Sequence, residues 1–66
     1  MKRLILHTDA IHDLEALKKF VTTQGNTVSL EETKNVSIVC PDNMVRKLSS
    51  LIEEFGYWVY MIFPVD

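Results

Sequence analysis

Seven consecutive apolar or aromatic residues close to the C-terminal end, residues 57–63 (YWVYMIF), constrain this chain more than any other stretch. The run has the length of a strand rather than a helix, and its β-branched and aromatic residues behind Gly56 are typical of a strand. Because alternate residues of a strand point to opposite faces, the run predicts two apolar rows. One row contains Tyr57, Val59, Met61 and Phe63, and the other contains Trp58, Tyr60 and Ile62.

Both faces of such a strand need cover, and a chain of 66 residues has little material to provide it. We expect a single domain over residues 1–66, with marginal stability unless it is cross-linked or assembled. Cys40 is the only cysteine, so no internal disulfide can form, and a cytoplasmic location is the simplest interpretation. The apolar start of the chain stops at His7, so neither a secretion signal nor a membrane span is predicted.

Alternation of apolar and polar residues between turn-forming residues predicts three further strands. Two longer stretches place apolar residues three or four apart and predict amphipathic helices. Their apolar positions are Ile11, Leu14, Leu17 and Val21 in the first helix and Met44, Leu48, Leu51 and Phe55 in the second. The predicted strands are residues 2–8, 27–32, 36–40 and 57–63.

Local signals predict where the two helices begin and end. Thr8 or Asp9 is expected to cap the first helix, because a side-chain oxygen can accept hydrogen bonds from the free amides of a first turn. Asp42 is expected to cap the second helix in the same way. Gly25 and Gly56 are predicted to end the helices, because glycine readily takes the left-handed conformation of a C-terminal cap.

The order strand, helix, strand, strand, helix, strand predicts an α+β two-layer sandwich with both helices on one face of a four-stranded antiparallel sheet. This pattern covers the whole chain and resembles the ferredoxin-like architecture. The resemblance is one of fold only, and it implies the spatial strand order fourth, first, third, second (4-1-3-2). The last strand is therefore expected at an edge of the sheet.

An edge strand that is apolar on both faces invites aggregation unless it is paired, covered or functional. We expect Val59 and Met61 to face the helices together with the other core rows. Because Trp and Tyr often anchor protein interfaces, the opposite, open face of the sheet is the candidate partner-binding surface. The competing interpretation is that the long side chains of Arg3 and Glu31 fold over it. The candidate partner-binding residues are Ile5, Val39, Trp58, Tyr60 and Ile62, and the same face is expected to carry His7 and Ser37.

A second cluster of chemically active residues lies where the first strand enters the first helix: His7, Asp9, His12 and Asp13. Imidazole and carboxylate groups are suitable metal ligands, but the spacing matches no metal motif. Asp9 and Asp13 are explained by their place at a helix start, where carboxylates are favoured. We therefore predict no metal and no cofactor.

Catalytic chemistry is not expected either. A cysteine nucleophile needs a histidine base within hydrogen-bond reach. Strand topology places His7 and Cys40 at opposite ends of the sheet, and we expect Cys40 to be a buried structural residue. Both glycines are used at helix ends, which leaves none for a phosphate-binding loop.

The formal net charge of −2 argues against a nucleic-acid-binding surface, which needs clustered Lys and Arg. The prediction is a small non-catalytic interaction module that binds a protein partner or forms a homodimer. We expect it to regulate or inhibit a larger complex, as small phage-encoded proteins do. The alternative is a regulatory module that binds a small ligand at a dimer interface. The sequence does not decide which row of residues 57–63 packs on the helices, because both rows are apolar.

Overall fold

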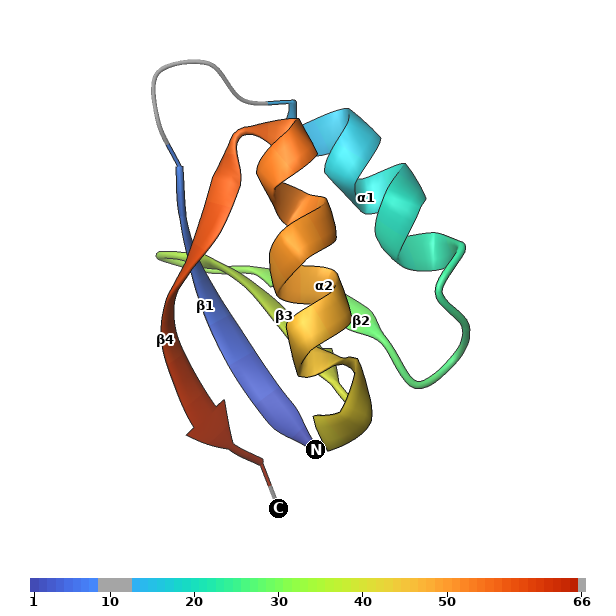
Figure 1. Ribbon diagram of the computed structural model, residues 1–66. Helices are drawn as coiled ribbons and strands as arrows, with labels where there is room; N and C mark the ends of the chain where they lie inside the picture. Colours follow the sequence, from blue (N-terminus) through green and yellow to red (C-terminus); the bar gives the residue numbers. More distant parts are fainter. Residues whose placement is uncertain (9–12, 66) are drawn as a thin grey trace.

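The computed structural model describes residues 1–8 and 13–65, which form a sheet layer and a helix layer (Figure 1). The prediction of a small α+β domain with a four-stranded antiparallel sheet and two helices is confirmed for this part of the chain. The elements are β1 (Lys2–Thr8), α1 (Leu14–Thr22), β2 (Ser29–Glu32), β3 (Val36–Cys40), the 3₁₀ turn η1 (Asp42–Met44), α2 (Val45–Leu51), the 3₁₀ turn η2 (Ile52–Phe55) and β4 (Tyr57–Pro64).

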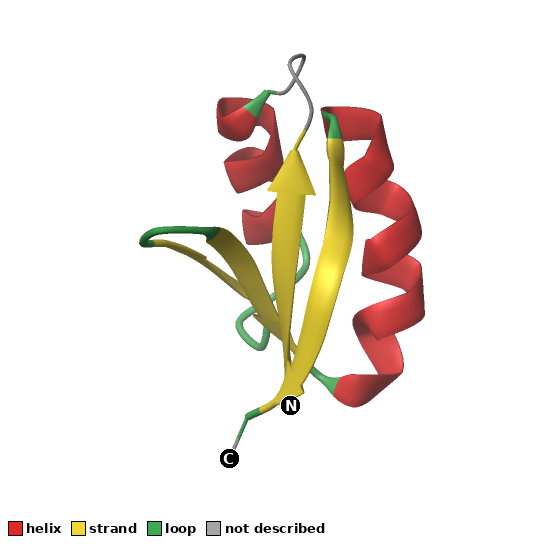
Figure 2. Ribbon diagram, turned by 90° about the vertical axis from the view of Figure 1, so that its left-hand side faces the viewer, coloured by secondary structure: helices red, strands yellow, loops and turns green. Residues whose placement is uncertain are grey.

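The strands lie side by side in the order β2-β3-β1-β4, and every neighbouring pair is antiparallel. Counted from the β4 edge, this is the fourth, first, third and second strand. In Figure 2 the β2–β3 hairpin projects to the left of β1 and β4. Neither helix passes in front of β1 or β4 in this view. One face of the sheet is therefore left without a helix over β1 and β4.

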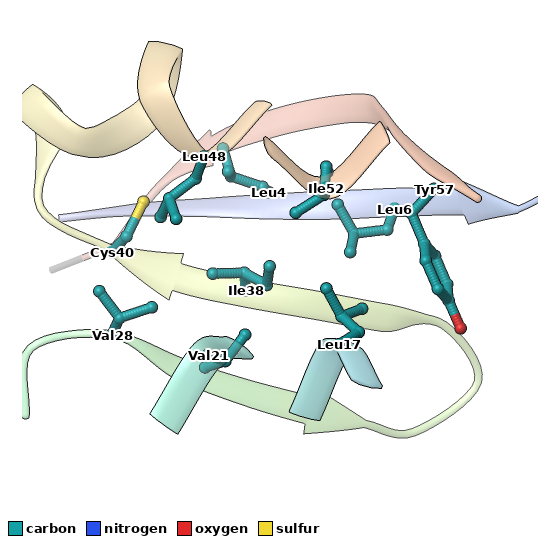
Figure 3. Close-up of a cluster of buried hydrophobic side chains, with 10 residues drawn as sticks. All are labelled: Leu4, Leu6, Leu17, Val21, Val28, Ile38, Cys40, Leu48, Ile52 and Tyr57. Atoms are coloured by element: carbon teal, nitrogen blue, oxygen red, sulfur yellow. The ribbon is translucent and has the colours of Figure 1, made fainter. Parts of the chain in front are cut away.

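The core lies between the other face of the sheet and the two helices (Figure 3). Leu4 is directly opposite Ile38 of β3, so the two side chains share the face that the helices cover. Leu17 of α1 and Leu48 of α2 pack on this face with no exposed surface. Full burial of such a side chain stabilises the fold by about 2 kcal/mol. The buried apolar residues are Leu4, Leu6, Leu17, Val21, Val28, Ile38, Cys40, Leu48, Ile52 and Tyr57.

The first helix begins later than predicted. Asp13 is its N-cap, and one carboxylate oxygen accepts a hydrogen bond from the backbone N–H of Ala16 at 3.0 Å. Of the two predicted caps, Thr8 belongs to β1 and Asp9 lies outside the described residues. All three residues have a suitable side-chain oxygen, so the local signal alone did not distinguish them.

The first helix also ends earlier than predicted, at Thr22 rather than next to Gly25. The Thr22 hydroxyl donates to the Lys19 carbonyl at 2.7 Å, and the Thr23 hydroxyl donates to the Phe20 carbonyl at 2.6 Å. These hydrogen bonds satisfy carbonyl oxygens that would accept from backbone N–H groups if the helix continued. Gly25 does adopt a left-handed conformation (φ 102°), but in the loop beyond the helix cap.

In the second helical segment, Gly56 ends the last turn in the left-handed conformation (φ 84°), as predicted. The predicted cap at Asp42 is wrong, because Asp42 is the first residue of η1, whose N-cap is Pro41, and the N-cap of α2 is Met44. Its carboxylate instead accepts from the N-terminal ammonium group of Met1 at 3.0 Å. That hydrogen bond lowers the pKa of the Asp42 carboxyl.

The two helical segments are joined at the end of the sheet where β1 stops. The backbone N–H of Asp13 donates to the carbonyl of Phe55 at 3.1 Å, and the Thr8 hydroxyl donates to the carbonyl of Gly56 at 3.0 Å. The rings of Phe20 and Phe55 pack with centroids 5.4 Å apart. These contacts fix the start of β4 beside the end of β1.

Cys40 lies in the core opposite Lys2, at the far end of β1 from His7. Burial raises the pKa of its thiol, and the nearby Asp42 carboxylate raises it further. A buried thiol that resists ionisation agrees with the expected structural role of this residue.

Replacement of Gly56 by alanine is expected to lower the free energy of unfolding by about 1–2 kcal/mol, the cost of a left-handed conformation for a residue with a Cβ atom. Gly56→Asn should lose less, because asparagine tolerates this conformation. Urea denaturation of the three proteins measures both effects. Equal stability of Gly56→Ala and wild type would contradict the left-handed cap.

The buried thiol should protect Cys40 from reagents in the folded protein. We expect DTNB to label Cys40 at least about a hundredfold more slowly than an exposed control thiol in Glu53→Cys, because the structure must first open. In denaturing urea the two rates should become equal. Because folding raises the thiol pKa, stability should also fall as the pH rises through the ordinary range of a cysteine pKa, where the unfolded chain ionises first.

Candidate functional site

β4 forms one edge of the sheet and pairs only with β1 among the described strands. It is eight residues long, and seven of these are the apolar and aromatic run. In its first half, alternate residues pack inward: Tyr57 is 2% exposed and Val59 is half-buried. Burial is the main reason why the pKa of the Tyr57 phenol is raised.

A β-bulge interrupts the ladder between β1 and β4. Val59 is opposite Leu6, but Met61 is opposite Ile5, so Tyr60 is the extra residue on the β4 side. The extra residue shifts the alternation of inward and outward side chains. Tyr60 and Met61 consequently share the open face. Each residue after them lies on the face opposite to the one it would have in a strand without a bulge.

The bulge overturns two of the predicted face assignments. Ile62 was expected on the open face, but it is opposite Leu4 and therefore lies on the helix face. Met61 was expected to face the helices, but it is opposite Ile5 on the open face. The assignment of Trp58 to the open face is correct, because Trp58 is opposite His7.

Ile62 nevertheless remains 49% exposed, because the end of β4 lies beside α2 and outside its cover (Figure 1). The exposed apolar surface therefore extends around the edge strand from the open face to the helix face. We call its five large side chains the β4 patch, and each of them is between 41% and 67% exposed. They are Trp58, Tyr60, Met61, Ile62 and Phe63.

His7 of β1 supports the open-face part of the β4 patch. Its ring packs on the Trp58 ring in a T-shaped arrangement with centroids 4.9 Å apart, and the centroid of Tyr60 is 6.1 Å away. Such contacts limit the rotamers of the two large rings. The sequence analysis placed His7 on the open face but did not foresee this contact, which depends on the register between β1 and β4.

The remaining predicted site residues are divided between two parts of the open face. Ile5 is half-buried and opposite Met61, so it continues the β4 patch onto β1. Val39 is also half-buried, but it is opposite Arg3 on one side and Ser29 on the other. Ile5, Trp58 and Tyr60 therefore belong to the paired strands β1 and β4, whereas Val39 lies on β3, which β1 separates from β4.

Arg3 and Glu31 cover the β2–β3 half of the open face, as the competing interpretation expected. The Arg3 guanidinium pairs with the Glu31 carboxylate and also donates to the Ser37 hydroxyl at 3.4 Å. Ser37 is only 4% exposed although no helix covers it. The open face thus has a polar, covered half and an apolar, exposed half.

The possible metal cluster is not assembled from the described residues. Asp9 and His12 lie outside them, Asp13 caps α1, and His7 packs on aromatic rings. In residues 1–8 and 13–65, no three His, Cys, Asp or Glu side chains gather in a way that could hold a metal ion.

A groove of about 360 Å³ lies between α1 and β2, at the opposite edge of the sheet from β4. Its apolar walls include Val21, Val28 and Leu30. At its polar side the Lys18 ammonium is 3.1 Å from a Glu32 carboxylate oxygen, and this contact raises the pKa of Lys18. The sequence analysis did not predict this groove, because it depends on how α1 lies against β2.

In the described part of the chain, no helix has both the length and the apolar character needed to cross a membrane.

No protein-family model matches the chain, and searches of curated proteins and of solved structures found no match.

Proposed function

We propose that this chain is a small non-catalytic module that binds a protein, either a different chain or its own copy, through the β4 patch and Ile5. The observation that carries the proposal is the β4 patch, which gathers five large apolar side chains, each more than two fifths exposed, on one edge strand. Monomeric proteins rarely expose large contiguous apolar surfaces without a use for them.

The size of the β4 patch supports a protein partner. With side chains on the order of 200 Å² each, its exposed part amounts to roughly 500 Å². Burial of this area would release roughly 12 kcal/mol, which is comparable to the cost of about 4–15 kcal/mol for bringing two molecules together. A useful partner must therefore contribute an apolar surface of its own, as protein interfaces do.

Charge supports the same class of partner. The sequence has no charged residue from 55 to 65, so the β4 patch offers no cation for a phosphate backbone. Trp, Tyr, Met and Phe are the residue types that protein interfaces favour. The rings of Trp58 and Tyr60, restrained by His7, would serve as anchors.

The strand order and the shared face of the two helices support a ferredoxin-like architecture, in which the open face of the sheet is available for binding. A chain this small, with one exposed apolar surface, suits a regulator or inhibitor that acts by occupying a site on a larger complex, including a phage-encoded one. The unpaired Cys40 thiol suits a cytoplasmic location, where thiols stay reduced.

Replacement of Trp58 by alanine is expected to weaken association at least tenfold, because a buried aromatic anchor is lost. The free energy of unfolding should change by no more than about 1 kcal/mol, since the ring is 41% exposed before binding. Sedimentation equilibrium measures self-association, and capture by the tagged chain from cell extract measures a foreign partner. As Trp58 is the only tryptophan, a blue shift of its fluorescence would accompany binding.

Glu53→Ala is the matched control, because this exposed side chain belongs to η2 and lies outside the β4 patch. It should bind as the wild type does. Unchanged association of Trp58→Ala would contradict the proposed surface, and loss of the fold in that variant would show that the ring is part of the core.

The groove between α1 and β2 favours a second candidate function, a regulatory module that binds a small ligand. Its volume is near the lower limit for ligand pockets, and it combines apolar walls with one cation and one carboxylate. This chemistry suits a zwitterion with an apolar side chain, such as an aliphatic amino acid. Because the groove and the β4 patch are at opposite edges of the sheet, the two functions do not compete.

For this second function, millimolar leucine should raise the melting temperature of the wild type, because a ligand that binds only the folded state stabilises it. Lys18→Ala should abolish the rise, while Lys47→Ala, on the exposed surface of α2, should not. An unchanged melting temperature with leucine, valine and phenylalanine would count against an amino-acid site in the groove.

A further inference from the structure

We propose that the partner of the β4 patch is a second copy of this chain, with the two β4 strands paired antiparallel around a two-fold axis. The two four-stranded sheets would then form one continuous eight-stranded sheet. This inference rests on the proposed function, and it adds the identity of the partner and the register of the contact.

The shape of the β4 patch favours pairing along the edge over stacking of two open faces. Trp58, Tyr60, Met61 and Phe63 lie on the open face, whereas Ile62 lies on the helix face, and all five are exposed. Two open faces stacked on each other would bury the first four and leave Ile62 in water. A strand added alongside β4 contacts side chains on both faces of the edge, so it reaches Ile62 as well as the other four.

The sequence of β4 lacks the features that discourage pairing with another strand. An exposed edge strand usually carries charged side chains or internal prolines that discourage pairing. β4 carries no charge, and its one proline is the final residue, Pro64. Its eight residues also make it the longest of the described strands. The side of β4 away from β1 is thus suited to pair with another strand.

The bulge in β4 fixes the register of such a pair of strands. Paired residues of antiparallel strands share a face, so inward residues must meet inward residues along the contact. Around the point between Tyr60 and Met61, the faces of β4 are symmetric. Two-fold pairing about that point places Trp58 opposite Phe63 on the open face. It also places Val59 opposite Ile62 on the helix face. If the two-fold axis passed through a single residue instead, some open-face residues would be paired with helix-face residues.

The proposed register also matches in chemistry. Each Trp58 ring would meet a Phe63 ring of the second copy, and aromatic pairs across neighbouring strands are favourable. The half-buried Val59 would gain the exposed Ile62 as a neighbour. Because residues 55–65 carry no charge, two copies of a chain with net charge −2 can approach here without local repulsion.

The first test is sedimentation equilibrium from low micromolar to millimolar concentration. The wild type should dimerise, and Ile62→Lys should raise the dimer dissociation constant at least about tenfold, because a lysine ammonium would be buried on the helix face. Val39→Lys is the control, since Val39 lies on the open face away from β4, and it should leave the constant unchanged.

The second test uses disulfide formation to read the register. A mixture of Trp58→Cys and Phe63→Cys proteins should form a mixed disulfide under mild oxidation, because these positions are opposite each other in the proposed dimer. The second Trp58–Phe63 contact of that mixed dimer remains intact. Trp58→Cys mixed with Ile62→Cys is the matched control and should not cross-link, because these two positions lie on different faces.

The outcomes separate this inference from the proposed function. A dimer weakened by Val39→Lys but not by Ile62→Lys would be a stack of open faces, which overturns edge pairing and leaves the proposed function standing. A monomer at every concentration also overturns the inference, and the β4 patch would then serve a foreign protein. A dimer that neither Ile62→Lys nor Trp58→Ala weakens would overturn both.

Discussion

The rest of the structure depends on the pairing of β1 with a strand on each side. Its central residue Leu4 is opposite Ile38 of β3 and Ile62 of β4, and it is completely buried under the helices. The two ladders hold together parts of the chain that are far apart in sequence and give the helices a surface to cover. They also leave β2 and β4 as edges, of which β2 lies beside α1, whereas the end of β4 extends beyond α2 (Figure 1).

Elements with strong local signals could be predicted from the sequence. The strand Val36–Cys40 has the predicted bounds, because turn residues and Pro41 border a short β-branched run. Gly56 ends the second helical segment as predicted, because its position needs a residue in the left-handed conformation. The start of α1 could not be predicted, since several residues with capping oxygens stand close together and packing selects Asp13.

The bulge explains why the candidate surface was only partly predicted. In a strand with one polar row, a shift of alternation would bury polar groups, so the sequence itself would reveal it. Residues 57–63 are apolar on both rows, so no such penalty exists and the register is set by pairing with β1. The same pairing brings His7 into contact with Trp58. The residue spacing within either strand does not predict this contact. On the other half of the open face, the cover by Arg3 and Glu31 agrees with the competing interpretation, because long charged side chains can lie over a neighbouring strand.

The ladder between β1 and β4 also affects the rate at which this chain folds. It pairs Lys2 with Pro64, and the backbone N–H of Val65 donates to the carbonyl of Met1 at 3.0 Å, so the pairing closes a loop of nearly the whole sequence. Loop-closure entropy must be overcome before such distant contacts are rewarded, which slows folding. A circular permutant that joins residue 65 to residue 1 and opens the chain in the turn at residues 33–35 would make β4 and β1 a local hairpin. β4 would then pair with β1 early in folding, so its apolar side chains would be exposed to solvent for a shorter time.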